Sequence, residues 1–187
     1  MTLSLGLDLS LTGTGLVILN EKKEVVEQKL IKSKKTGDTP KEELERLIGI
    51  REEIQTIVDD VSNNFKRSRP KMAAIEGPAF MVRNATALVQ LGALSYMIRE
   101  LLYARSIPFV IVAPTTLKKF ITGKGSSDKN VVLMEIFKRY GQTFTDDNLG
   151  DAYALARVAD TILGGEALAE NQEQRDVLKT LARQYAG

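Results

Sequence analysis

The hydrophobic pattern is clearest at the start of the chain, where apolar and small or polar residues alternate over 3–9. An alternation of period two is typical of a β-strand. A run of small and hydroxyl-bearing residues at 10–15 follows, and a second apolar run at 16–19 comes after it. We therefore predict a β-hairpin over 3–19. Its first strand carries a carboxylate, Asp8, whose desolvation must be compensated by groups elsewhere in the chain.

The remaining pattern switches between helical and strand-like periods. Apolar residues at three- and four-residue spacing over 44–65 predict a long amphipathic helix, and short apolar runs at 72–76 and 108–112 predict buried strands. The other expected elements are a strand at 25–33, a helix at 84–105, a short helix at 114–120, a helix around 131–137, a helix at 146–162 capped by Thr145, and a polar helix within 166–185. We therefore predict one α/β domain over 1–163, with a mixed five-stranded sheet and helices on both faces, and a peripheral helical extension of it at 164–187.

The amino-acid composition says little about the fold but restricts the chemistry that the chain can perform. The 187 residues include neither cysteine nor histidine. Disulfide frameworks, thiolate zinc sites, histidine-dependent nucleophiles and histidine-ligated metals are therefore excluded, and carboxylates, lysines and hydroxyl groups remain. We expect no signal peptide and no membrane span, and a cytoplasmic location.

The net charge is only +2, but the basic residues are clustered. Residues 22–35 hold six lysines against two glutamates, and residues 118–139 hold six basic residues against two acids. Local basic patches on a nearly neutral chain favour a polyanionic partner on one face. A solvated basic surface without a partner is the alternative for either patch.

Three carboxylates lie on separate predicted elements: Asp8 on the first strand, Glu76 at the end of the 72–76 strand, and Asp151 on the 146–162 helix. Asp151 and Asn148 continue the apolar stripe of that helix, so they are expected to face the core. Converging oxygen ligands without histidine or cysteine favour Mg²⁺ or Mn²⁺. Structural alternatives remain for each acid: a hairpin cap, a solvated strand end, and an ion pair with a lysine, respectively.

Four segments, GLDLSLTGTG, AAIEGPAF, TTLKKFITGKGSSDKN and DDNLGDAYALA, resemble the successive motifs of RuvC-like Holliday-junction resolvases, members of the RNase H-like nuclease superfamily. The resemblance implies an RNase H-like fold and a homodimeric, structure-selective endodeoxyribonuclease that nicks four-way DNA junctions, with flaps and forks as further possible substrates. It also implies two-metal-ion hydrolysis with two Mg²⁺ ions in each active site, for which Mn²⁺ can substitute. A junction-binding protein without nuclease activity and an actin-like-fold ATPase fragment are the alternatives.

Position by position, the resemblance implies that Asp8, Glu76 and Asp151 bind metal. Family members usually carry a fourth ligand, Asp or His, three residues before the last acid, where this chain has Asn148. Asp147 precedes it and offers a charge, although it can equally serve only to complement a helix N-terminus. We expect Asn148 to face the metal ions and Asp147 to assist from the edge of the site.

The resemblance also marks Lys118 and Lys129 as catalytic residues that hold the scissile phosphate. Lysine suits this role because its ammonium binds phosphate as a point charge. The full set of predicted DNA contacts is Lys118, Lys119, Lys124, Lys129, Phe80 and Arg83. Phe80 corresponds to an aromatic that wedges into the junction centre in the family, and it is equally consistent with a core side chain.

Overall fold

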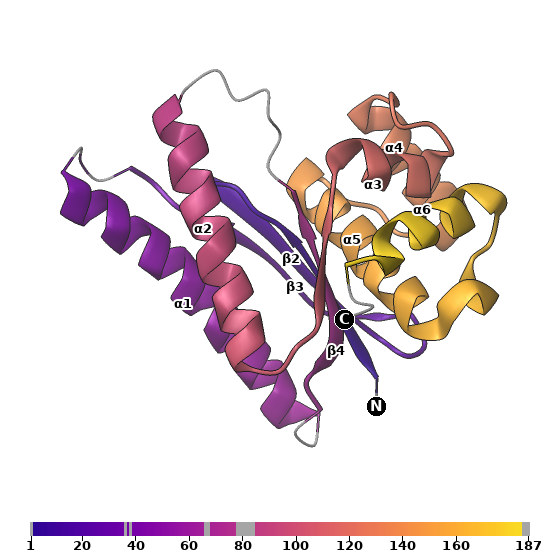
Figure 1. Cartoon of the computed structure of the whole chain (residues 1–187), viewed down its shortest axis with the longest axis horizontal. Coiled ribbons are helices and arrows are strands. Elements are labelled where there is room, and N and C mark those ends of the chain that lie inside the picture. Colours follow the sequence, from indigo (N-terminus) through magenta and orange to yellow (C-terminus); the bar gives the residue numbers. More distant parts are fainter. Residues whose placement is uncertain (1, 36, 38, 66–67, 78–84, 185–187) are drawn as a thin grey trace.

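The computed structural model describes the whole chain except residues 1, 36, 38, 66–67, 78–84 and 185–187. At its centre lies a five-stranded mixed sheet with the strand order β3-β2-β1-β4-β5 (Figure 1). The strands are β1 Leu3–Asp8, β2 Gly13–Asn20, β3 Val25–Lys32, β4 Pro70–Glu76 and β5 Phe109–Val112. The first three strands form an antiparallel meander, whereas β4 and β5 run parallel to β1. The predicted mixed sheet is confirmed.

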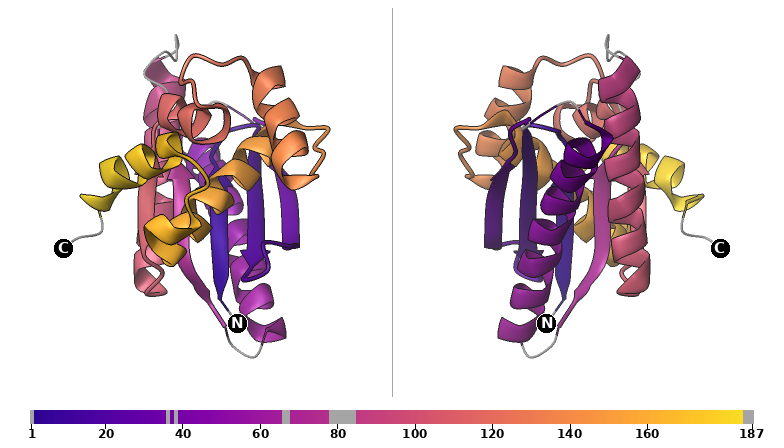
Figure 2. Two further views of the ribbon diagram at one scale, coloured as in Figure 1. Left: turned by 90° about the vertical axis from the view of Figure 1, so that its right-hand side faces the viewer. Right: turned by 90° about the vertical axis from the view of Figure 1, so that its left-hand side faces the viewer.

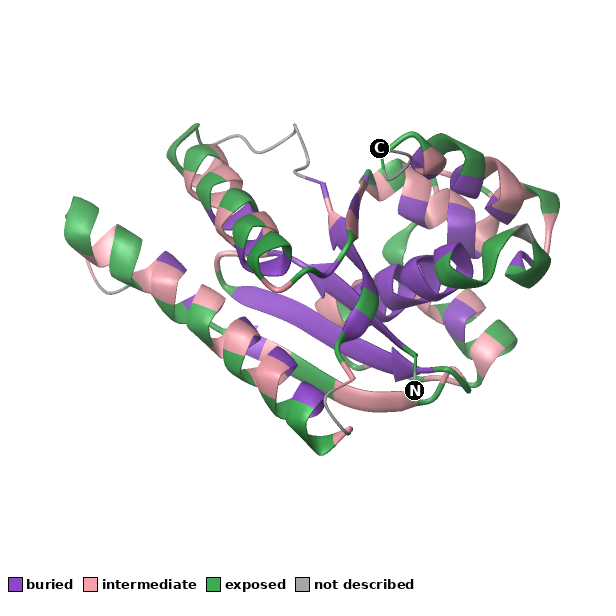
Figure 3. Ribbon diagram, turned by 60° about the horizontal axis from the view of Figure 1, so that its bottom comes forward, coloured by how far each residue is buried: buried purple, intermediate pink, exposed green. Residues whose placement is uncertain are grey.

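Two helical layers cover the sheet, and the side views of Figure 2 separate them. The helices are α1 Pro40–Asn64, α2 Ala85–Ala104, α3 Pro114–Thr122, α4 Lys129–Tyr140, α5 Asp147–Gly164, the 3₁₀ turn η1 Gly165–Leu168, and α6 Gln172–Ala182. One face carries α1 and α2, and the other carries α5 with α3, α4 and α6 around it. Each layer has its own hydrophobic core, so the sheet is buried on both sides (Figure 3). This explains why β1 is entirely buried rather than alternately exposed.

The α5 helix lies unusually close to the sheet, because glycines remove the side chains that would separate them. A Cβ atom on Gly6 of β1 would come within 2.0 Å of the Ala152 carbonyl oxygen, and one on Gly15 of β2 within 2.1 Å of the Asn148 carbonyl oxygen. Real Cβ atoms essentially never approach main-chain atoms so closely. The small residues of the hairpin therefore let the main chain of α5 rest directly on β1 and β2.

The structure corrects one expected helix boundary. We predicted that Thr145 caps the helix of Asp151, but the N-cap is Asp146, whose carboxylate accepts a hydrogen bond from the Asn148 amide at 2.9 Å. Aspartate is the stronger N-cap residue of the two.

The C-terminal helix α6 packs against the domain. It buries Val177 and Leu178 in the hydrophobic core on the α5 side of the sheet. Among the described helices, none is long and apolar enough to cross a membrane.

Candidate active site

The two strand carboxylates meet at one edge of the sheet. Asp8 is the last residue of β1, and Glu76 is the last residue of β4. The two strands are parallel neighbours with Leu7 opposite Ile75, so their carboxyl ends coincide. Asp151 lies just over one turn into α5, the helix that rests on β1 and β2. Three elements that are distant in sequence thus bring these acids together.

Burial and mutual repulsion define the electrostatics of this cluster. Asp8 is only 6% exposed, and burial together with the charge of Glu76 raises its pKa to about 8. Its carboxyl group also hydrogen-bonds to Glu76. Burial raises the pKa of Glu76 as well, with the charge of Asp151 adding to the rise. Burial and the charge of Asp8 raise the pKa of Asp151 to about 6. The cluster therefore favours the protonated, neutral forms of these carboxyl groups, chiefly because they are buried.

Two lysines oppose these upward pKa shifts. Lys129, the first residue of α4, acts to lower the pKa of all three acids, and Lys118 of α3 acts in the same direction on Glu76 and Asp151. Neither lysine outweighs burial, because the net pKa shift of each acid is upward. Both ammonium groups are thus close enough to the carboxylates to act on their pKa values.

The other predicted basic residues are placed differently. Lys119 faces α6, where its Nζ lies 3.6 Å from a carboxylate oxygen of Asp176. Lys124 is exposed in the turn between α3 and α4. Phe80 and Arg83 lie outside the described residues, so their predicted roles stay predictions.

The start of α5 presents three polar side chains in succession. Asp147 is the most exposed of them, and its carboxylate lies 3.5 Å from Nζ of Lys129 and acts to raise the pKa of Asp151. Asn148 is half-buried, with its side-chain amide over Gly13 at the start of β2. Asp146 acts to raise the pKa of Asp8 in addition to capping the helix.

The donor set suits a hard divalent cation. The clustered groups are carboxyl oxygens, and burial, with the charges of neighbouring acids adding to it, raises their pKa values. Among the described residues, no group of three or more acidic side chains is already placed to hold a metal ion. Mg²⁺ usually binds only one or two carboxylates and completes its shell with waters and substrate phosphates.

The turn after Asp8 was predicted from the sequence, but the two contacts that hold it were not. Thr14 donates to the Ser10 carbonyl at 2.8 Å and accepts from the Ser10 amide at 3.1 Å, which closes the turn after Asp8. Arg46 of α1 donates to the Leu11 carbonyl in the same turn. The hydroxyl residues are a recognisable turn signal, whereas no local pattern links Arg46 to a turn 35 residues away.

Comparisons with known proteins agree with this fold and identify a family. The sequence model of the family described as "Crossover junction endodeoxyribonuclease RuvC" matches residues 4–159. Two relatives of that name, from Prochlorococcus marinus strains NATL1A and NATL2A, are each 31% identical over 157 residues, which cover 81% of this chain and 94% of the relative.

Two solved structures share the fold at 20% sequence identity, each matching 83% of this chain and 91% of its own. They are Thermus thermophilus RuvC, with a TM-score of 0.64, and T. thermophilus RuvC in complex with a Holliday junction substrate, with a TM-score of 0.67. The family match and the identity to the relatives decide the assignment: the chain belongs to the RuvC family of crossover junction endodeoxyribonucleases.

Proposed function

We propose that this protein is a metal-dependent endodeoxyribonuclease that nicks four-way DNA junctions. The observation that carries the proposal is the cluster of Asp8, Glu76 and Asp151 at the carboxyl edge of β1 and β4, in a chain of the RuvC family. Relatives at 31% identity are named crossover junction endodeoxyribonucleases, and a RuvC of the same fold is solved with a Holliday junction. We also propose a cytoplasmic location, since the proposed substrate is DNA inside the cell.

Metal dependence is a property of the family, and we propose Mg²⁺, with Mn²⁺ as a substitute and two ions in each site. Asp8, Glu76 and Asp151 are the proposed ligands, with Asn148 as a neutral oxygen donor and Asp147 at the edge. When bound, the two ions supply a water of lowered pKa and a Lewis acid for the leaving oxygen. The buried carboxylates fix the ligand positions because their strands and helix are rigid parts of the core.

We propose that the scissile phosphate is contacted by two lysines, Lys118 of α3 and Lys129 at the start of α4. Both are near enough to act on the acids' pKa values, so an ammonium here can also reach a phosphate held at the cluster. As preorganised positive charges they would stabilise the charge that develops on the phosphate during hydrolysis. Lys119 and Lys124 are proposed to contact DNA farther from the cut, with Lys119 first leaving its pair with Asp176.

A homodimer is part of the proposal, because symmetric resolution of a junction requires two cuts in opposed strands. The α2 helix supports it with an exposed stripe at heptad spacing: Val89 is 71% exposed, Tyr96 70% and Tyr103 82%. Arg99 lies over the ring of Tyr96 at 4.7 Å and prolongs the stripe. Large exposed aromatics of this kind are enriched at protein–protein interfaces, so a second copy of α2 is the proposed occupant.

The test is an assay of purified protein with a synthetic four-way junction, a flap, a fork and a linear duplex, each with Mg²⁺, Mn²⁺ or EDTA. The proposal expects paired nicks with 5′ phosphates in the junction, present with either metal and absent with EDTA. Tight junction binding without cleavage in any metal would instead support a binding protein. Equal cleavage of linear duplex would contradict structure selectivity.

A further inference from the structure

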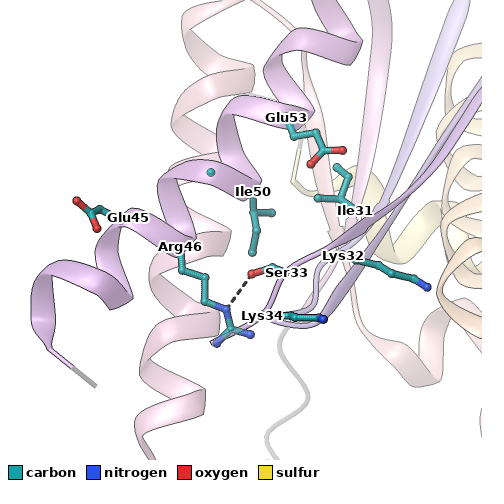
Figure 4. A pocket seen from close by; sticks show the side chains of 9 residues that line it. Ile31, Lys32, Ser33, Lys34, Glu45, Arg46, Ile50 and Glu53 are labelled. Carbon is teal, nitrogen blue, oxygen red and sulfur yellow. Dashed lines mark hydrogen bonds between the residues drawn. The ribbon is translucent and has the colours of Figure 1, made fainter. Parts of the chain in front are cut away.

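A second polar pocket lies at the same end of the sheet as the acids, on the α1 side. It has a volume of about 420 Å³ and lies between the residues that leave β3 and the first turns of α1 (Figure 4). Its lining includes Lys32, Ser33 and Lys34 from the end of β3 and Arg46 and Ile50 from α1. None of these residues belongs to the site proposed above.

Arg46 is held in place within this pocket. Its Nε donates to the Ser33 hydroxyl at 2.9 Å, and its Nη2 donates to the Leu11 carbonyl. A guanidinium has five N–H donors, so these two bonds leave the remaining donors for a ligand. Figure 4 shows Lys34 next to Ser33, on the same side of the pocket as the Arg46 guanidinium. Arg46 is thus a preorganised anion binder rather than a flexible surface cation.

The two cations are not neutralised by neighbouring acids. Among the described residues, neither Arg46 nor Lys34 takes part in an ion pair. Two glutamates also line the pocket, but Glu45 pairs with Lys41 at 3.7 Å on the outer side of α1. Glu53 lies at the opposite end of the pocket, beside Ile31 (Figure 4). The mouth near Arg46 is therefore the positive end.

Sheet register gives the separation of this pocket from the catalytic acids. Asp8 pairs with Gly15 across β1 and β2, and Gly13 pairs with Lys32 across β2 and β3. From Asp8 to Lys32 the path crosses two strand spacings of the sheet and runs two residues along β2. These two perpendicular steps place the two Cα atoms about 12 Å apart. Successive phosphates of one DNA strand advance about 3.4 Å along the helix axis. The pocket is therefore within a few nucleotides of a phosphate bound at the acids.

We propose that this pocket binds a backbone phosphate of the DNA substrate, a few nucleotides from the scissile phosphate, through Arg46 and Lys34. The inference rests on the proposed nuclease function and adds a contact on the side of Asp8 opposite Lys118 and Lys129. Because Arg46 also holds the turn that follows Asp8, a phosphate bound here sets the register of the strand relative to the catalytic acids. A bidentate guanidinium–phosphate contact provides that geometric restraint.

The first experiment measures junction binding by Lys34→Ala and Arg46→Ala proteins in EDTA over a range of salt concentrations. Each substitution should weaken binding and reduce the slope of log affinity against log salt by about one unit. Lys22→Ala removes the same charge from the β2–β3 turn at the far end of the sheet and should leave the slope unchanged. Wild-type slopes for both pocket variants would overturn the proposal while leaving junction cleavage, and so the proposed function, intact.

The second experiment replaces single phosphates of the junction by neutral methylphosphonates near the cut. The wild-type protein should lose affinity when the phosphate at one position, a few nucleotides from the scissile phosphate, is replaced. The Lys34→Ala variant already lacks this contact, so the same replacement should not weaken its binding further. Equal sensitivity of both proteins at every position would overturn the assignment. Since Arg46→Ala also frees the Leu11 carbonyl, its saturated cleavage rate is measured as well. A lower rate with unchanged affinity would make Arg46 a positioning residue only and would contradict phosphate binding.

Discussion

The two helical layers of this protein use opposite kinds of packing. On the α5 side, Ala152 and Ala156 lie against Gly6 and Gly15, and main chain meets main chain. On the α1 and α2 side, large side chains such as Ile54 fill the space between helix and sheet. The first arrangement brings α5 close to β1, so that Asp151 lies near enough to Asp8 for the charge of Asp8 to raise its pKa. The second provides stability and leaves an outer surface for partners. The layers also differ in burial: α5 is buried along most of its length, whereas α1 and α2 bury only one face.

The largest expected effect is on cleavage, from substitutions of the three carboxylates near the contact between α5 and the sheet. Asp8→Asn, Glu76→Gln and Asp151→Asn should each reduce junction cleavage to background, since each removes a charged metal ligand. Binding should be retained, because most affinity for DNA comes from basic contacts to phosphates. Cleavage and mobility-shift assays on the same preparations measure both quantities. Wild-type cleavage by any one variant in Mg²⁺ would remove that residue from the site.

Adding one methyl group should have opposite effects in the two layers. Gly6→Ala drives a Cβ to within 2.0 Å of the Ala152 carbonyl oxygen and should destabilise the protein by about 3 kcal/mol or more. Gly49→Ala, in the exposed part of α1 with nothing within 4 Å, should stabilise it by up to about 1 kcal/mol. Urea unfolding followed by circular dichroism gives both free energies of unfolding. Equal effects would show that α5 is not in main-chain contact with the sheet.

The outer surface of the α2 layer should govern self-association. Tyr96→Ser combined with Tyr103→Ser should raise the dimer dissociation constant by about tenfold or more, since buried tyrosines are common interface hot spots. Phe137→Ser on α4 removes another exposed aromatic, 56% exposed, from the opposite layer and is the matched control. Sedimentation equilibrium measures both. If only the α4 variant dissociates, the interface lies on the α5 side and the proposed α2 pairing is wrong.

The raised pKa of Asp8 predicts a stability that depends on pH and metal. Its carboxyl titrates near 3.8 when unfolded and at about 8 when folded, so the folded state retains the proton between these values and stability falls as pH rises through that window. Asp8→Asn should therefore raise Tm in EDTA by several degrees at about pH 8 and change it little at about pH 4. Added Mg²⁺ should raise the Tm of the wild type more than that of the variant. Thermal scans that show equal gains at both pH values would contradict burial as the cause.

The smallest predicted effect concerns the start of α5. Asn148 is half-buried beside the hairpin, whereas Asp147 is exposed and paired with Lys129. We therefore expect Asn148→Leu to reduce cleavage more than Asp147→Asn, and Asn148→Asp to retain or raise it. Rates over a series of Mg²⁺ concentrations measure the difference. An inactive Asp147→Asn beside a nearly normal Asn148→Leu would reverse the assignment.

Most elements could be predicted from the sequence because their signals are local. The alternation at 3–9, the small residues before the second apolar run and the three- and four-residue spacing of α1 each depend on neighbouring residues. The predicted cap at Thr145 was wrong because several capping residues stand in succession there, and the main-chain angles and the hydrogen bond to the Asn148 amide identify Asp146 as the cap. The three acids were also predicted, since each interrupts an apolar pattern at a position where a carboxylate is costly.

The sequence by itself determined which groups are available: carboxylates on separate elements and clustered lysines, in a chain without histidine or cysteine. Only the tertiary structure decided how they meet. The closeness of α5 to Gly6 and Gly15, the turn of Lys119 toward Asp176, and the reach of Arg46 to the Leu11 carbonyl all join residues far apart in sequence. The physical reason is that local periodicity fixes which face of an element is buried, whereas the distance between two packed elements depends on every side chain between them.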